Sequence, residues 1–219
     1  PYLRFKDTHL AHHRDAVLTD PYDDPESNYR DPARWTLMAR WQCRLLEANN
    51  TLAGRLLLGP AIGQWAFMAG DLRALRAGDR RVALGWLLHL PGVALVLGGV
   101  AVAGSMPWWA FASGTYMALA LLKIRTFLEH QAHEKARART VIIEESGPLA
   151  LLFLNNNLHV VHHVHPAVPW YRLPGLYRAN QARYLARNEG YVYSGYGEIF
   201  RRYLIRAKDP VPHPLWPRG

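Results

Sequence analysis

Histidines gather in two places along the chain. The pattern His-x-x-His-His occurs twice, in THLAHHRD near the start and in NLHVVHHVHP toward the end. If each segment is helical, residues three and four apart share one face, so the imidazoles of a pattern point into one small volume. Neutral imidazole suits zinc, copper, iron and nickel, and the repeat therefore predicts a transition-metal site. Its predicted ligands are His9, His12 and His13 from the first pattern and His159, His162 and His163 from the second.

The rest of the composition narrows the chemistry of that site. Cys43 is the only cysteine, so four-thiolate zinc sites and iron–sulfur clusters are excluded. Six or more nitrogen ligands exceed the four that one zinc ion takes, and two metal ions fit the count better. A zinc hydrolase would place its carboxylate base in a His-Glu-x-x-His motif, which the sequence lacks.

Two apolar runs lie between the histidine patterns. Residues 82–103 and 104–122 contain no charged side chain, and each run has about the 20 residues that a membrane helix needs. Pro107 breaks the helix between them, and the adjacent tryptophans suit a membrane interface. The sequence thus predicts a transmembrane hairpin over residues 82–122. Arginine and lysine flank its two outer ends, so the positive-inside rule predicts that both ends face the cytoplasm.

A hairpin that crosses the membrane twice returns the chain to the same side, where the two histidine patterns can meet. His130 follows one or two helical turns beyond the second run, in KIRTFLEHQAHEK, and is the predicted seventh ligand. His133 could share its helical face but is more typical of a solvated histidine. His89, inside the first run, is expected to pack or to make a polar contact.

Three further segments give weaker signals. Residues 56–69 are apolar but interrupted by Gly59 and Pro60, which favours an interfacial or re-entrant segment over a span. Asp31 and the proline after it open an amphipathic helix that lies either on the membrane surface or on the cytoplasmic part. The acidic stretch 19–31 lacks the spacing of an EF-hand loop and is expected to be a solvated connection.

The charge of the chain bears on its partners. It carries 26 Lys and Arg against 17 Asp and Glu, a net charge of +9. The positive residues are spread along the membrane flanks and the tail, not interleaved with aromatics in one groove, so no nucleic-acid partner is expected. Membrane topology accounts for most of them, and some suit an acidic protein or anionic lipid headgroups.

The paired His-x-x-His-His boxes around a membrane hairpin, with RTFLEH between them and NNNLHVVHHVHP near the end, resemble the membrane-bound fatty acid desaturases. The resemblance covers residues 1–205 and leaves 206–219 as a Pro-rich tail. It extends to a wider superfamily that includes hydroxylases and carotenoid ketolases. It implies an all-α integral membrane protein of a bacterial inner membrane, with a cytoplasmic helical cap that holds the histidine-rich metal site.

The resemblance also implies a chemistry. The box histidines of that family hold a non-haem di-iron centre, and the family's additional histidine between the boxes matches His130. O2 would be the co-substrate, a fatty acyl chain the substrate, and a ferredoxin-like or cytochrome b5-like protein the electron donor. The alternatives are a hydroxylase or ketolase acting on a carotenoid or other lipid, and a non-catalytic metal-binding membrane protein. The implied iron ligands are His9, His12, His13, His130, His159, His162 and His163.

Groups around the ligands are harder to identify. Carboxylates hydrogen-bonded to metal-binding imidazoles fix the orientation of the rings. One of the asparagines at 155–157 would hold a metal-bound water or cap a helix. The candidate carboxylates, each more typical of a solvated surface residue, are Asp15, Glu129, Glu134, Glu144 and Glu145.

One feature departs from the family's pattern. A His-x-x-x-His box normally precedes the first His-x-x-His-His box, and nothing before His9 supplies it. The chain also begins with Pro1 rather than Met. We therefore expect this sequence to be the C-terminal part of a longer protein, without two of the family's iron ligands. A short homologue with seven ligands is the alternative.

Overall fold

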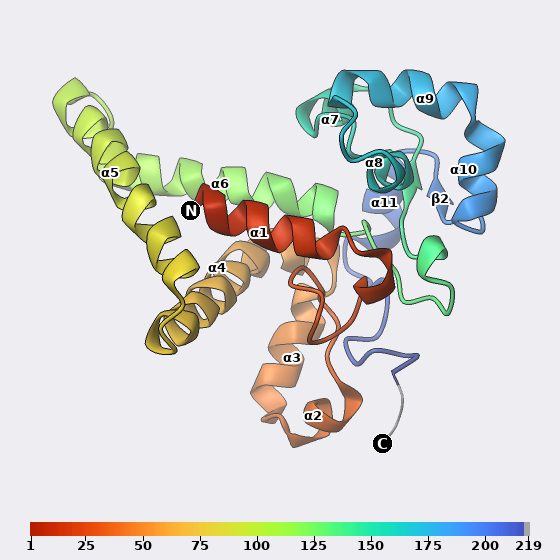
Figure 1. The fold of residues 1–219 in the computed structure, drawn as a ribbon, viewed down its shortest axis with the longest axis horizontal. Helices are drawn as coiled ribbons and strands as arrows, with labels where there is room; N and C mark the ends of the chain where they lie inside the picture. Colours follow the sequence, from red (N-terminus) through yellow and green to blue (C-terminus); the bar gives the residue numbers. More distant parts are fainter. Residues whose placement is uncertain (217–219) are drawn as a thin grey trace.

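The structure is a computed structural model that describes residues 1–216, apart from the side chain of Asp15. It is mostly helical (Figure 1), as the sequence predicted. Short 3-10 helices lie at Asp15–Val17, Ala136–Ala138 and Trp170–Arg172, and the strands β1 (Ile142–Ile143) and β2 (Val192–Tyr193) pair in parallel. The α-helices are α1 (Tyr2–His12), α2 (Pro32–Leu37), α3 (Arg40–Asn49), α4 (Leu52–Arg76), α5 (Arg80–Ala103), α6 (Trp108–Thr126), α7 (Pro148–Leu152), α8 (His159–Val164), α9 (Leu173–Ala179), α10 (Gln181–Arg187) and α11 (Tyr196–Tyr203).

The long helices and the short helices form two parts of the molecule. Helices α4, α5 and α6 lie together, and α7 to α10 gather at the other side, with α1 running from the first part toward α8 (Figure 1). The buried apolar side chains divide in the same way. One cluster, which includes Leu52, Ile124 and Ile199, joins α4, α6 and α11. The other, which includes Val161 and Tyr177, joins α8, α9 and α10.

The predicted hairpin forms two helices joined by a short turn, but two membrane spans are not found in the described residues. Helix α5 ends before Gly104, which adopts the left-handed conformation at φ 65°, and α6 begins directly after Pro107. Of the helices in the described residues, α5 is the one long and apolar enough to cross a membrane, and its apolar stretch is not buried by the rest of the chain. Helix α6 packs mainly along α4, while α5 rests on α1 and α4. Helices α5 and α6 therefore do not form a pair of membrane spans that pack mainly on each other.

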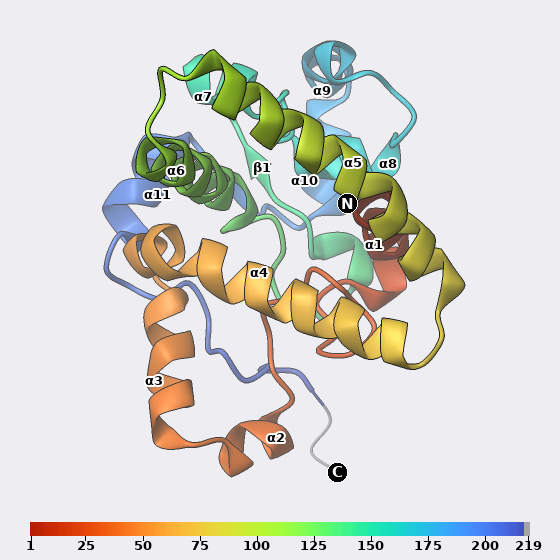
Figure 2. The same cartoon turned by 90° about the vertical axis from the view of Figure 1, so that its left-hand side faces the viewer.

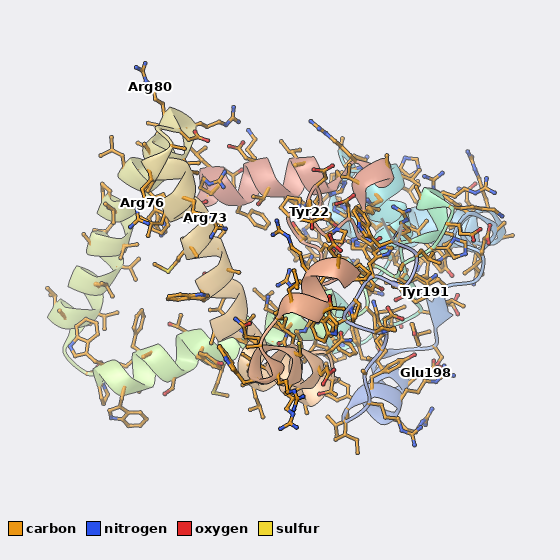
Figure 3. All side chains as sticks on the ribbon, turned by 90° about the horizontal axis from the view of Figure 1, so that it is seen from below. Tyr22, Arg73, Arg76, Arg80, Tyr191 and Glu198 are labelled. Atoms are coloured by element: carbon orange, nitrogen blue, oxygen red, sulfur yellow. The ribbon has the colours of Figure 1, made fainter. Side chains whose placement is uncertain are left out.

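Arginines mark one end of α5. Figure 3 shows Arg73, Arg76 and Arg80 at the corner where α4 passes into α5, and all three are exposed. The opposite end of α5 meets the uncharged turn before Trp108. Charge is thus confined to one end of the apolar helix, as the positive-inside argument requires.

Residues 56–69 do not meet the criterion for a span, as predicted, but the break at Gly59 and Pro60 that a re-entrant segment would have is not present. Helix α4 continues through Gly59 and Pro60, both of which are buried. A side chain at Gly59 would lie 3.4 Å from Cγ of Lys123, and one at Gly63 would lie 3.3 Å from its Nζ. Small residues here let α6 lie close to α4, so the pattern that suggested a break serves helix packing.

The single amphipathic helix expected after Asp31 is also wrong, because it is two helices. Asp31 does cap α2, accepting a hydrogen bond of 2.7 Å from the amide of Ala33. The chain then becomes extended at Met38 and Ala39. A second helix starts there, with the Gln42 side chain accepting a hydrogen bond of 3.1 Å from the Ala39 amide.

Helix α1 is anchored to α4 and α5 by one buried carboxylate. Asp71 of α4 accepts hydrogen bonds of 2.7 to 3.1 Å from the guanidinium of Arg4, and one of 2.8 Å from the indole of Trp86 on α5. The Asp71 side chain is 3% exposed. Figure 2 shows the result: α1 lies against α5 near the end where α4 and α5 join. Its other end, which carries the first histidine box, is free to reach the short helices.

We expect the Asp71→Asn substitution to destabilise the protein through α1. It keeps the shape of the side chain but removes the charge that hydrogen-bonds to the Arg4 guanidinium, which costs about 3 kcal/mol in the free energy of unfolding. Denaturant unfolding in detergent micelles would measure it. The control is Asp7→Asn, which breaks the pair with Arg81, whose guanidinium is largely exposed, and should change little. Equal losses in the two variants would contradict the anchoring role of Asp71.

Candidate metal centre

The structure brings all seven predicted histidines together. Within each of two groups, one potential ligand nitrogen per residue lies within 4.8 Å of the others. The two boxes face each other, because the ring of His13 stacks on that of His163 at 4.4 Å between centroids and meets the edge of His162 at 4.6 Å. The four-histidine group is His12, His130, His159 and His163, and the three-histidine group is His9, His13 and His162.

Three separate segments supply these side chains. His9 and His12 lie on α1, and His13 is the residue that ends it. The second box lies on α8, as its spacing predicted. His130, however, does not extend a helix: α6 ends at Thr126, and His130 sits in an extended bridge with Thr140. The predicted helical position of His130 is therefore wrong, because the chain turns there to pair with residues 139–141.

Polar side chains behind the rings fix which nitrogen faces the centre. Nδ1 of His12 lies 2.8 Å from Oδ1 of Asp24, and Nδ1 of His9 lies 3.0 Å from Oε1 of Glu26. Nδ1 of His159 lies 3.2 Å from Oδ1 of Asn156. Each of these oxygens accepts a hydrogen bond, so each Nδ1 is assigned the proton and each Nε2 presents a lone pair to the interior.

The inward nitrogens carry too few protons for every short contact between them to be a hydrogen bond. Nε2 of His130 lies 2.8 Å from Nε2 of His12 and 3.1 Å from Nε2 of His159. A neutral imidazole has one N–H, so His130 can donate to at most one of these two lone pairs. In the other group, Nε2 of His13 lies 3.1 Å from Nε2 of His9. Converging lone pairs are what a bound cation requires, and the arrangement can hold one metal ion in each group.

Burial keeps most of these imidazoles neutral. It lowers the pKa of His13 to about 3 and that of His162 to about 4, and repulsion from neighbouring histidines, His163 first, acts in the same direction. Burial also holds the pKa values of His130 and His159 well below their ordinary range. Since a ligand imidazole must be unprotonated, these four rings are ready to bind a metal at neutral pH.

Two acidic residues that the sequence analysis placed in a solvated connection belong to the site. Asp24 is 5% exposed, and its second oxygen accepts a hydrogen bond of 2.8 Å from the Thr19 amide. Burial opposes the charged form of His12, yet the hydrogen bond to Asp24 and the charge of Glu26 raise its pKa. Burial would raise the pKa of Glu26, but the hydrogen bond from His9 and the charge of His12 lower it to about 2. The signal that could have found them is the nearness of an acidic stretch to the first box.

Of the carboxylates proposed beforehand, Glu129 is the one found beside a histidine. It is 4% exposed, and its Oε1 lies 3.8 Å from Nδ1 of His159. Glu144 instead accepts hydrogen bonds from Tyr177 and Gln181. Glu145 accepts one from the Gly147 amide, Glu134 is exposed, and the side chain of Asp15 lies outside the described part.

The remaining polar candidates lie elsewhere. Asn156 touches His159 as described, whereas the amide of Asn157 donates to the Ile143 and Glu145 carbonyls. His133 lies outside both groups, with its Nε2 3.5 Å from Oε2 of Glu189. The ring of His89 meets that of Trp86 edge-on, in agreement with a packing role.

The family model for fatty acid desaturases matches residues 1–195. The chain belongs to the fatty acid desaturase family. It is also similar to a beta-carotene ketolase of Paracoccus sp. (strain N81106 / MBIC 01143), with 27% identity over 177 residues, 76% of this chain and 54% of the relative. The chain therefore spans about half the length of that curated relative. No solved structure matches it significantly.

We expect Asp24→Asn to weaken metal binding, because the new amide group can accept hydrogen bonds through only one of the two positions that now bind His12, Thr19 and Glu26. The amide cannot hold the His12 ring as an acceptor-only carboxylate does. Loss of such a partner lowers the metal affinity about 10- to 100-fold. Competition for Fe(II) with a chelator of known affinity, without oxygen, would measure it. The control is Asp23→Asn, because the neighbouring Asp23 is exposed. An unchanged affinity in Asp24→Asn would show that Asp24 does not support the centre.

Proposed function

We propose that this chain carries the metal centre of an oxygen-dependent di-iron oxidoreductase that introduces a double bond into a fatty acyl chain. The observation that carries the proposal is the pair of histidine groups, held by carboxylate and amide partners on their outer sides. Family membership supports a lipid-modifying oxidase. One iron ion would be bound by His12, His130, His159 and His163, and the other by His9, His13 and His162.

The donor set favours iron over metals that prefer sulfur or oxygen ligands. All the ligands are nitrogens, and groups of four and three leave coordination positions open on both ions. Two bound iron ions would activate O2, with electrons from a ferredoxin-like or cytochrome b5-like protein. The chain's own residues hold ligand rings in place through Asp24, Glu26 and Asn156. Burial keeps four of the rings neutral, those of His13, His130, His159 and His162.

A membrane location supports a lipid substrate. Large apolar side chains of α5 are exposed, among them Leu95 at 78% and Val102 at 89%, and an apolar surface of this extent requires a lipid or protein partner. We propose that α5 inserts into the bacterial inner membrane with its arginine-flanked end at the cytoplasmic face. The metal centre would then lie on the cytoplasmic side, within a desaturase-like domain of residues 1–205 followed by the tail 206–219.

A carotenoid ketolase or hydroxylase is the second candidate, because a curated relative is a beta-carotene ketolase. The two activities would use the same histidines and differ in the substrate that reaches them. Lipid analysis of cells that express the protein separates them. New unsaturated acyl chains support the desaturase, and oxygenated carotenoids in a carotenoid-producing host support the ketolase.

We expect two iron ions per chain and their loss when ligands are replaced. The protein would be purified in mild detergent from iron-supplied cells, and His13→Ala and His159→Ala should each remove iron from one of the two groups. His133→Ala is the matched control, because His133 pairs with Glu189 outside the centre. Zinc near one ion per chain, or no metal in the unsubstituted protein, would contradict the di-iron proposal. Metal without lipid turnover would favour a non-catalytic metal-binding protein.

A further inference from the structure

His130 is held differently from the other ligands that have a known partner. The rings of His9, His12 and His159 each have an oxygen acceptor behind Nδ1. Nδ1 of His130 is buried and faces no side-chain acceptor within the described residues; the group that acts on it as a hydrogen-bond acceptor is the backbone carbonyl of Arg139. The ring of His130 is thus held by the backbone of its own loop, and its position depends on how that loop is fixed.

The C-terminal segment supplies a contact to that backbone. The ammonium of Lys208 donates a hydrogen bond to the His130 carbonyl. Its side chain is 11% exposed, and Nζ also lies 3.4 Å from Oδ2 of Asp209. A buried ammonium requires such partners, so Lys208 and the His130 carbonyl fix each other's positions.

Tyr29 makes a second contact on the same turn. Its hydroxyl accepts a hydrogen bond of 2.9 Å from the amide of Ala132 and donates one of 2.5 Å to Oδ2 of Asp209. The tail is in turn paired with the segment that carries Tyr29, through the bonds from the Arg30 amide to the Val211 carbonyl and from the His213 amide to the Arg30 carbonyl. The turn that bears His130 is therefore bound on two sides by residues far away in sequence.

We infer that Lys208 is a positioning residue of the metal centre: through the His130 carbonyl it sets where Nε2 of His130 lies in the four-histidine group. The inference rests on the proposed metal-binding function. The match to the desaturase family ends at residue 195, so Lys208 and Asp209 lie beyond it and add a support that family membership does not assign. If the tail only stabilised the fold, its loss would lower stability without changing the metal.

The test compares three variants of the 219-residue chain loaded with 57Fe. Lys208→Met removes the donor to His130, and Tyr29→Phe removes both of its hydrogen bonds while keeping a ring to pack on His213. Lys135→Met is the control, because Lys135 lies on the same loop but pairs with Glu189, 2.6 Å away, outside the centre. Iron content, Mössbauer spectra and thermal unfolding would be measured on each.

We expect Lys208→Met to change one of two iron signals, by a shift or by loss of that iron, and to leave the other intact. Tyr29→Phe should change the same signal less, and Lys135→Met neither. A Lys208→Met protein with wild-type iron content and spectrum overturns the inference, even if it unfolds at a lower temperature. If Lys208→Met does not fold, Tyr29→Phe decides by the same criterion. A wild-type chain that binds no iron overturns the proposed function and, with it, this inference. A wild-type chain that binds iron, beside an unchanged Lys208→Met spectrum, overturns this inference alone.

Discussion

Seven imidazoles packed against one another destabilise the fold unless their inward nitrogens bind a partner. A buried polar group without a partner costs about 1 to 3 kcal/mol, and Nε2 of His162 is such a nitrogen. Protonation would offer each lone pair a proton, but burial opposes the charged form. The fold thus gathers neutral imidazole nitrogens whose lone pairs lack partners. Two bound cations would supply those partners, so that the free energy lost on burial is recovered when metal binds. The rest of the structure serves to bring these side chains together and hold them there.

The supports differ from ligand to ligand. The loop at 19–31 folds back so that Asp24 and Glu26 stand behind His12 and His9, and its own backbone amides bind Asp24 from Thr19 and Glu26. On α8, the residues just before the helix supply Asn156, with Glu129 nearby. A carboxylate left buried without a partner would be costly. Asp24, the buried acidic residue of this loop, therefore depends on His12 as His12 depends on it, whereas Glu26 remains partly exposed.

The sequence predicts features that follow from the spacing of nearby residues. It does not predict contacts between residues that only the folded chain brings together. Both boxes were predictable because offsets of three and four residues place histidines on one helix face whatever the surroundings. The burial of Asp24 was not, because an acidic turn-rich stretch reads the same whether it is solvated or folded back, and the left-handed conformation of Thr19 that helps the loop to turn has no clear sequence signal. Gly59 and Pro60 misled for a related reason: residues that break an isolated helix also permit close packing, and only the presence of α6 decides between the two.

Helix α1 links the metal centre to the apolar helices. Arg4 binds the buried carboxylate of α4, and His12 lies eight residues further along the same helix, about 12 Å away at 1.5 Å per residue. Because a helix is stiff over this length, the ligands of α1 take their position from the junction of α4 and α5. The second box takes its position from the other core cluster, around α8 to α10. The two halves of the centre are thus held by different parts of the molecule and meet directly, with the ring of His13 stacked on that of His163.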